Sequence, residues 1–216
     1  MLKGYSGKPS NKNFENKDVK ELISPLNRSL VRDVSRLEKA RPWVVIPEEF
    51  YNATTQMCNT ERETRGVLLT KMPNNVNERY VVEAMLTIGY GTSVGVFLDE
   101  DKFKAIKKLL SLHPEIKGID FHSHTVATGA SYYDKFSDHN GGDIDSLKNN
   151  INKNPNYKHI LFTPTHIISF GLELPQVLVS DFTKKDAQGL TLPNPSQTQH
   201  ILREEFNCIL EEIRRK

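Results

Sequence analysis

The chain has 216 residues, of which 37% are hydrophobic and 26% charged, and its formal net charge is +2. These values predict one somewhat polar globular domain with elaborations. The near balance of charges argues against a nucleic-acid partner, and the lack of an apolar run of about 18 residues argues against a membrane-spanning helix.

The N-terminal stretch and the cysteines point to a cytoplasmic protein. The first residues are rich in Lys, Asn and Ser and lack the apolar core of a secretory signal. The two cysteines, Cys58 and Cys208, are too few for a disulfide framework and have no metal-binding spacing. We therefore expect a reducing environment, with Cys58 as a buried packing residue rather than a nucleophile.

In the first half of the chain, strands alternate with helices. Residues 1–28 are expected to form a flexible segment, because residues 1–18 combine Gly, Ser, Lys and Asn with isolated apolar residues. Ser29 can cap a short helix that Pro42 ends, and Pro47 can start a second helix. Hydrophobic patterning predicts an amphipathic helix at residues 99–110 and strands at residues 43–46, 63–70, 80–88 and 94–97, with a glycine-rich interruption at residues 89–91.

In the second half, a strand at residues 119–124 ends in two histidines, and a helix begins at Asp143. Short strands follow at residues 159–162, 166–170 and 176–179, and a Pro/Asn linker at residues 192–195 leads to a last helix. Ser196 fits a capping box there, and the apolar stripe comprises Leu202, Phe206, Ile209 and Ile213. We expect a mixed α/β (α+β) fold with one domain at residues 29–190, and a linker with a C-terminal helix at residues 191–216 that packs back on it.

Two histidines two residues apart are the strongest chemical signal in the chain. In an extended strand, the side chains of His122 and His124 lie on the same face, because successive side chains alternate between faces. Such a pair can bind a divalent metal ion at two points. A lone histidine beside an apolar strand is more often structural, but two on one face after residues 118–121 favour a metal site.

The third ligand is expected from the acid-rich stretch that follows. Asp134, Asp138 and Asp143 each offer a carboxylate. Asp143 follows two glycines, which let the loop fold back toward the strand, and it opens an amphipathic helix. In the alternative interpretation, Asp143 only caps that helix. Three N/O ligands with one position left for water are typical of a catalytic zinc ion.

A distant acid and a loop serine are placed to complete such a site. Glu63 stands where a strand begins, and a carboxylate beside zinc-bound water can take its proton and later pass it to a leaving amine. Ser137 can donate a hydrogen bond to the oxyanion that develops on a scissile carbonyl. Without the histidines, Glu63 would be an exposed acid before a strand, and Ser137 an ordinary loop residue. Glu61 is an acid of the same type without that context.

The order of these residues resembles the JAMM (MPN-plus) metalloprotease family. The family pattern is a distant Glu followed by H-x-H-x(7)-S-x-x-D, with the last Asp opening a helix. The chain carries Glu63 before an apolar strand, then His122-x-His124, then Ser137 and Asp143. The resemblance spans about residues 43–180. Within the family, the chain is similar in particular to the proteasome-lid deubiquitinase and its archaeal and prokaryotic relatives.

The resemblance implies a cytidine-deaminase-like central sheet flanked by helices, and a zinc ion held by His122, His124 and Asp143. Glu63 would act as the general acid/base, and Ser137 would stabilise the tetrahedral intermediate. The implied reaction cuts the isopeptide or peptide bond after the C-terminal glycine of ubiquitin or a ubiquitin-like modifier, with a proteasome-like assembly as a further partner. No covalent intermediate is implied, so no nucleophilic cysteine is needed.

The spacing departs from the family pattern after the second histidine. Ser137 precedes Asp143 by six residues rather than three, so we interpret residues 138–140 as an insertion, in which His139 is a further candidate ligand. A rival alignment uses Ser131 and Asp134, which have the expected S-x-x-D spacing but no good amphipathic helix after them. Thr125 also replaces a proline that many family members carry.

Two segments beside the predicted site are candidates for gripping the modifier. Residues 90–97 and 125–136 flank the site, and an extended tail can pair with residues 93–97 as an added strand; an ordinary hairpin is the alternative. Two other functions stay open. One is a non-catalytic scaffold of the same fold that binds partners, and the other is a metallopeptidase that processes a sulfur-carrier protein or a small peptide.

Overall fold

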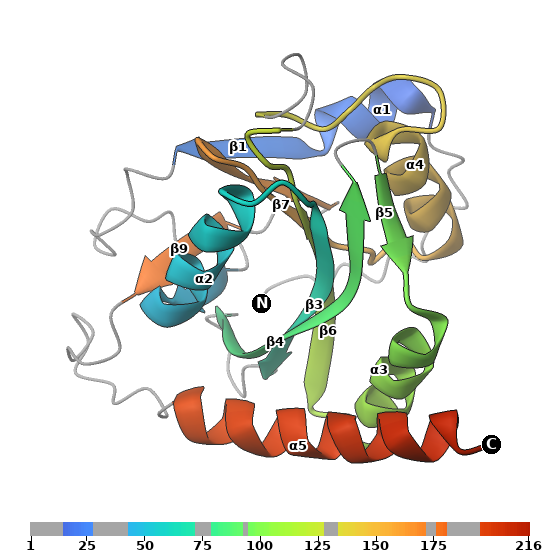
Figure 1. Cartoon of the computed structure of the whole chain (residues 1–216). Coiled ribbons are helices and arrows are strands. Elements are labelled where there is room, and N and C mark those ends of the chain that lie inside the picture. The colour runs from blue at the N-terminus through green and yellow to red at the C-terminus, as the bar shows by residue number, and fades with distance from the viewer. Residues whose placement is uncertain are drawn as a thin grey trace, which may run out of the picture.

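The computed structural model describes residues 15–27, 43–71, 79–92, 95–127, 134–171, 176–180 and 195–216. These residues form five helices and nine strands in a mixed α/β arrangement (Figure 1). In chain order the elements are α1 (Asn16–Glu21), β1 (Ile23–Asn27), β2 (Trp43–Pro47), α2 (Glu48–Cys58), β3 (Thr64–Lys71), β4 (Arg79–Thr92), β5 (Gly95–Leu98), α3 (Glu100–Leu112), β6 (Ile116–Ser123), α4 (Asp143–Lys153), β7 (His159–Phe162), β8 (His166–Phe170), β9 (Gln176–Ser180) and α5 (Pro195–Arg214).

The nine described strands belong to one curled, mixed sheet. Its order is β1-β8-β7-β6-β3-β4-β2-β9, and β5 pairs with β4. The pairs β6–β7, β2–β4 and β2–β9 are parallel, and the other pairs are antiparallel. β6 therefore lies inside the sheet between β3 and β7, where neighbouring strands hold its backbone on both sides.

Helices cover both faces of the sheet. On one face, Phe50 of α2 packs in a core with Leu68 of β3. The neighbouring residues Val67 and Leu69 point to the opposite face, where α3 and α5 cover them. α1 and α4 lie side by side on this second face, over Leu161 of β7 (Figure 1). The second face thus carries two separate cores, one under α3 and α5 and one under α1 and α4.

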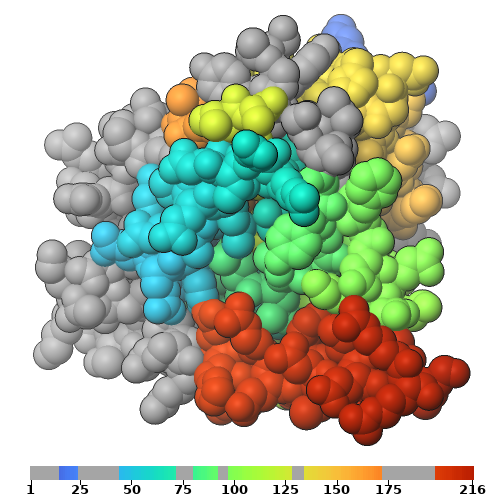
Figure 2. Space-filling model, in the orientation of Figure 1, coloured from blue at the N-terminus to red at the C-terminus, as the bar shows by residue number. Residues whose placement is uncertain are grey.

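The predicted apolar stripe of α5 is confirmed. Leu202, Phe206 and Ile209 are buried, and Ile213 packs partly buried beside them. These residues lie against α3 and β4, and Figure 2 shows α5 along the lower edge of the molecule. The last helix therefore packs back on the domain, as expected. The capping box at Ser196 lies outside the side chains that the structure describes.

The prediction of a flexible segment over residues 1–28 is wrong for residues 15–27. These residues form α1 and β1, and β1 extends the sheet by pairing with β8. Val19 is fully buried in the core beneath α4. The sequence signal was weak because a helix this short is not stable alone and is ordered by tertiary packing. The helix predicted from Ser29 lies outside the described residues, as do residues 1–14.

The predicted interruption of the third strand at residues 89–91 is also wrong. β4 continues to Thr92, because β5 folds back and pairs with it, with Tyr90 opposite Phe97. A Cβ atom on Gly89 would lie 2.2 Å from the carbonyl oxygen of Phe97. The glycine therefore permits a close approach of two backbones instead of ending the strand.

Most of the remaining elements follow the sequence prediction. β7 and β8 have the predicted bounds, and α4 begins at Asp143 with Ile144, Leu147 and Ile151 buried. Pro195, expected in the linker, is the first residue of α5, and residues 192–194 lie outside the described residues. No helix in the described part of the chain has both the length and the hydropathy needed to cross a membrane.

Candidate metal centre

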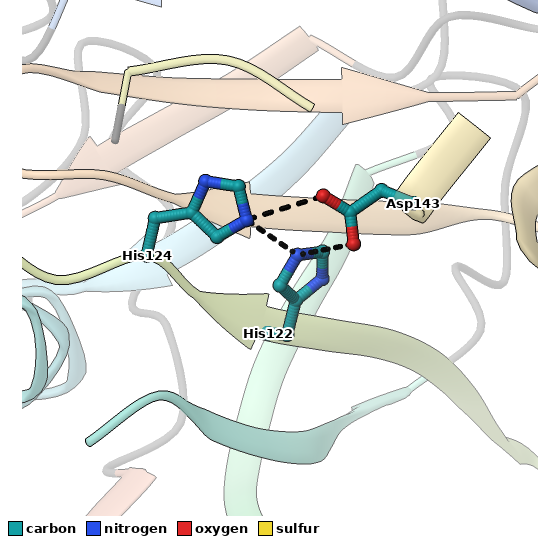
Figure 3. A group of neighbouring side chains, drawn as sticks. All are labelled: His122, His124 and Asp143. Atoms are coloured by element: carbon teal, nitrogen blue, oxygen red, sulfur yellow. Dashed lines mark hydrogen bonds and ion pairs between the residues drawn. The ribbon is translucent and has the colours of Figure 1, made fainter. Parts of the chain in front are cut away.

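Two histidines and one aspartate converge at the end of β6. His122 is the penultimate residue of β6 and His124 directly follows the strand, so both side chains lie on one face, as predicted. Asp143 reaches the same point from the first residue of α4 (Figure 3). The ligand atoms of this trio all lie within 4.8 Å of one another. The two imidazoles are buried, with exposed fractions of 7% for His122 and 2% for His124.

The separations within the trio fit a small tetrahedral ion. Nε2 of His122 lies 3.2 Å from Nε2 of His124 and 3.2 Å from Oδ1 of Asp143. Nε2 of His124 lies 3.2 Å from Oδ2 of Asp143. Zinc with bonds of about 2.0–2.1 Å at tetrahedral angles has ligand atoms about 3.3–3.4 Å apart. The donor set of two imidazoles and one carboxylate therefore fits zinc, and three protein ligands leave one tetrahedral position for another group.

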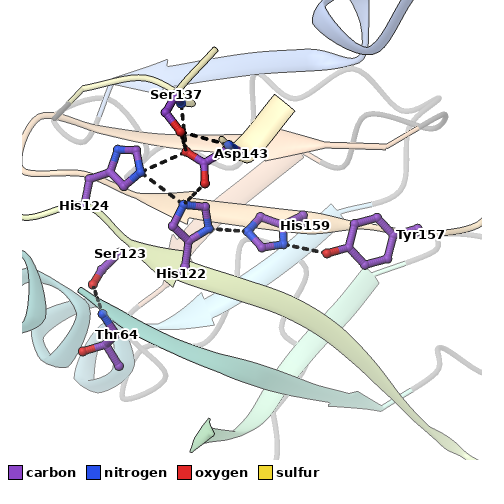
Figure 4. A network of polar contacts seen from close by, with 8 residues as sticks. All are labelled: Thr64, His122, Ser123, His124, Ser137, Asp143, Tyr157 and His159. Carbon is purple, nitrogen blue, oxygen red and sulfur yellow. Dashed lines mark hydrogen bonds and ion pairs between the residues drawn. The ribbon is translucent and has the colours of Figure 1, made fainter. Parts of the chain in front are cut away.

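Ser137 holds Asp143 in place. Its backbone N–H and its hydroxyl both donate to Oδ2 of Asp143, at 2.8 and 2.7 Å, and its Oγ accepts from the Asp143 N–H at 2.9 Å (Figure 4). This serine supplies the side-chain cap that Gly142, the N-cap residue of α4, cannot provide. Asp143 is the first residue of the helix and not its cap, so both of its carboxylate oxygens can face the histidines.

The residues between Ser137 and Asp143 form a compact turn. The N–H of Gly142 donates to the carbonyl of His139 at 2.9 Å, and Gly141 has a φ of 77°, a left-handed conformation that favours glycine. A Cβ atom on Gly142 would lie 2.9 Å from Oγ of Ser137. The extra residues loop outward, so the serine and the aspartate meet despite their wide spacing, as the insertion interpretation predicts.

The structure separates the acids that compete in the sequence. Asp138 forms an ion pair with Lys20 at 3.1 Å, away from the histidines. Asp134 is not part of the converging trio, and neither is the exposed His139. Of the three predicted acids, only Asp143 joins the two histidines, which agrees with the preferred alignment.

Asp143 keeps its negative charge at this site. Burial alone would raise its pKa, but the adjacent imidazoles of His122 and His124, which contact its carboxylate oxygens, hold the pKa of Asp143 well below its usual range. The ionised carboxylate faces two imidazole nitrogens in a partly buried position, and this environment suits a cation.

Glu63 directly precedes β3, the strand that pairs with β6. The two strands pair antiparallel up to Arg65 opposite His122, and the N–H of Thr64 donates to Oγ of Ser123 at 3.0 Å. If this register continues by one residue, Glu63 is set opposite His124, and opposite residues share a face of the sheet. Glu63 is 6% exposed, whereas Glu61 is on the surface. The interpretation of Glu63 as an exposed acid is therefore wrong, and its position suits a group that acts next to the ligands.

Behind His122 lies a buried series of hydrogen-bonded side chains that the sequence did not predict. Nδ1 of His122 lies 2.6 Å from Nε2 of His159, and Nδ1 of His159 lies 2.9 Å from the hydroxyl of Tyr157 (Figure 4). That hydroxyl donates to Oδ2 of Asp120 at 3.1 Å, and Arg65 lies 3.8 Å from the same oxygen. No local motif marks these residues. The signal that could have found them is the parallel pairing of β6 with β7, which sets His159 beside Asp120.

Burial shifts the pKa values of these side chains. It lowers the pKa of His159 well below its usual value, and the Arg65 charge acts in the same direction. Burial raises the pKa of Tyr157, which keeps its proton. Burial also raises the pKa of Asp120, while the Arg65 charge and the Tyr157 hydroxyl oppose that rise.

Comparison with protein-family models gives no match, and comparison with curated proteins gives no significantly similar sequence. The fold and the site together define a mixed α/β protein whose central strand and neighbouring helix form a candidate metal centre.

Proposed function

We propose that this protein is a JAMM-type zinc metallopeptidase that cuts the amide bond after the C-terminal glycine of ubiquitin or a ubiquitin-like modifier. The observation that carries the proposal is the convergence of His122, His124 and Asp143 at separations of 3.2 Å. A zinc ion held by this trio would supply Lewis-acid activation of water and of the scissile carbonyl.

Glu63 is the proposed general acid/base. Its side chain is buried, and the register of β3 and β6, continued beyond Arg65, would set it opposite His124. It would accept a proton from the attacking water and deliver that proton to the leaving amine, a role that typically contributes about 10²–10⁴-fold in rate.

Ser137 has a positioning role in this proposal. A hydroxyl has one proton, and that of Ser137 is donated to Asp143. The oxyanion role implied by the family resemblance requires this hydroxyl to turn away from Asp143 during the reaction. The backbone N–H of Ser137 would then still hold the aspartate, since it donates to the same oxygen.

The hairpin of β4 and β5 supports an extended peptide as the substrate. β5 pairs only with β4 among the described strands, which leaves its other edge free of described strand partners. Phe97 and the opposite Tyr90 are 74% and 54% exposed. This hairpin adjoins the general acid/base, because the N–H of Gly91 donates to the carbonyl of Glu63 at 2.8 Å. The flexible tail of a modifier could add to such an edge as a strand, with apolar side chains on the aromatic pair.

The test combines zinc content with hydrolysis of a fluorogenic amide at the C-terminus of ubiquitin and of several ubiquitin-like proteins. We expect one zinc ion per chain, and cleavage that a chelator abolishes and added zinc restores. Glu63→Gln should lower kcat by about 10²–10⁴-fold with zinc retained. Glu61→Gln, on an exposed acid two residues away, should leave kcat unchanged.

Four results would overturn the proposal or part of it. A zinc-free chain, or cleavage that Glu63→Gln leaves intact, would refute the mechanism. One bound zinc ion without hydrolysis of any modifier would favour the non-catalytic scaffold. Cleavage restricted to a sulfur-carrier protein or to short peptides would keep the mechanism and replace the substrate.

A further inference from the structure

We propose that His159, Tyr157 and Asp120 form a hydrogen-bond relay that fixes which ring nitrogen of His122 carries the proton, and so presents Nε2 of His122 to the metal. This inference rests on the metal centre proposed above. It assigns positioning roles to three residues that no motif marks.

Successive hydrogen bonds connect the members of the relay. From His122 to His159 the nitrogens are 2.6 Å apart, and from His159 to the Tyr157 hydroxyl the distance is 2.9 Å. The last link is the hydrogen bond of 3.1 Å from the Tyr157 hydroxyl to Oδ2 of Asp120. Each link lies within hydrogen-bond distance. Both nitrogens of His159 are thereby occupied, so this histidine is a supporting residue and not a fourth metal ligand.

Counting protons gives the relay its direction. Two neutral imidazoles and one phenol each have a single exchangeable proton to donate. Tyr157 donates its one proton to Oδ2 of Asp120, so His159 must donate from Nδ1 to the tyrosine oxygen. Nε2 of His159 is then a bare acceptor, which requires the proton of His122 to sit on Nδ1. The lone pair of His122 is left on Nε2, the atom that faces His124 and Asp143.

The hydrogen bond that Tyr157 donates to Asp120 separates this direction from the reverse. In the reverse order, every donor would switch, and Nε2 of His122 would carry the proton. That form could donate to Asp143 but could not bind a metal. A metal ion on Nε2 of His122 would leave the ring proton on Nδ1, so metal binding and the hydrogen bond from Tyr157 to Asp120 require the same direction. Groups that hold the second nitrogen of a metal-binding histidine typically change metal affinity by about 10–100-fold when removed.

Tyr157→Phe is the sharpest test, because it removes one hydroxyl and keeps the ring. The tautomer of His122 can be measured in the metal-free protein by NMR with ¹⁵N-labelled histidine, and the zinc Kd by competition with a chelating dye. We expect Nδ1–H at His122 in the unaltered protein. In Tyr157→Phe we expect a substantial Nε2–H population and a zinc Kd raised by about 10–100-fold. Tyr51→Phe, at a similarly half-buried tyrosine on α2, is the control and should change neither value.

A pair of variants at His159 separates hydrogen bonding from packing. His159→Gln keeps a hydrogen-bond acceptor for His122 and a donor for Tyr157. His159→Leu keeps a side chain of similar volume but has no hydrogen-bonding group. Zinc affinity should be largely retained in the glutamine variant and lost by about 10–100-fold in the leucine variant. Equal loss in both would assign His159 a packing role and overturn the relay.

The outcomes distinguish the relay from the metal centre. If the unaltered protein binds zinc but Tyr157→Phe changes neither the His122 tautomer nor the zinc Kd, the relay is refuted and the metal centre stands. If the unaltered protein binds no zinc, the metal centre fails and the relay fails with it.

Discussion

Replacing Asp143 by asparagine tests the ligand assignment directly. Oδ2 of Asp143 accepts two hydrogen bonds from Ser137, so an asparagine should place its carbonyl oxygen there and turn its NH₂ group toward His122. An NH₂ group offers no lone pair to a metal, and the negative charge is lost as well. The fold should survive, because the contacts with Ser137 remain, but zinc affinity should fall.

The size of the effect follows from linkage between binding and folding. At a free zinc concentration of about 100 times Kd, zinc adds about 2.7 kcal/mol to the free energy of unfolding. Loss of a direct ligand should weaken binding at least about 100-fold, the upper end for loss of an outer hydrogen-bond partner. The same zinc concentration then adds only about 0.4 kcal/mol. For a chain of 216 residues, the zinc-induced rise in Tm should shrink from about 5–11 °C to about 1–2 °C.

Thermal unfolding followed by circular dichroism, with and without zinc, measures this rise. Asp134→Asn is the matched control, because Asp134 competes with Asp143 in the sequence but lies outside the trio. It should keep the full zinc-induced rise. If Asp134→Asn abolished the rise while Asp143→Asn preserved it, the ligand assignment would be refuted and the rival alignment would gain support.

Two further predictions concern the docking of α5. Leu202→Ala should lower the free energy of unfolding by about 2–5 kcal/mol, because Leu202 is only 2% exposed. Ile201→Ala is the control: Ile201 is 61% exposed, so this change should alter the free energy of unfolding by less than about 0.5 kcal/mol. Equal effects of the two variants in urea titrations would contradict the packing of α5. His113, after α3, bonds Glu205 of α5 at 2.7 Å, and this hydrogen bond raises the pKa of His113. The contact therefore stabilises the fold below about pH 6.5 and is lost as the pH rises through the raised pKa. His113→Gln should be more destabilising at about pH 6 than at about pH 9, and an unchanged cost across that range would rule out this contribution.

The elements that carry the ligands could be predicted because their signals are local. The period-2 spacing of His122 and His124 set both side chains on one face of β6, and the spacing of Ile144, Leu147 and Ile151 fixed the buried stripe of α4. Ser137 could be paired with Asp143 across an insertion because two glycines allow a tight return of the chain. These features depend on neighbours within about two helical turns, which sequence patterns report well.

What the sequence did not predict depends on contacts between distant segments. The relay joins residues of β6 and β7 that are separated by 37 positions, so no spacing rule links His159 to His122. α1 contributes one buried side chain, Val19, and its order comes from α4 and β8 rather than from its own propensity. At Gly89 the usual meaning of glycine as a strand breaker was outweighed by the approach of the β5 backbone.

The three ligands belong to parts of the molecule that are anchored differently. His122 and His124 come from an interior strand held on both sides, whereas Asp143 sits on a helix whose core includes α1. Outward movement of α4 would remove the one charged ligand from a bound ion and leave the two imidazoles in place. The lifetime of a bound metal ion should therefore depend on how firmly α4 is anchored, and Val19 of α1, far from the chemistry, contributes to that anchoring.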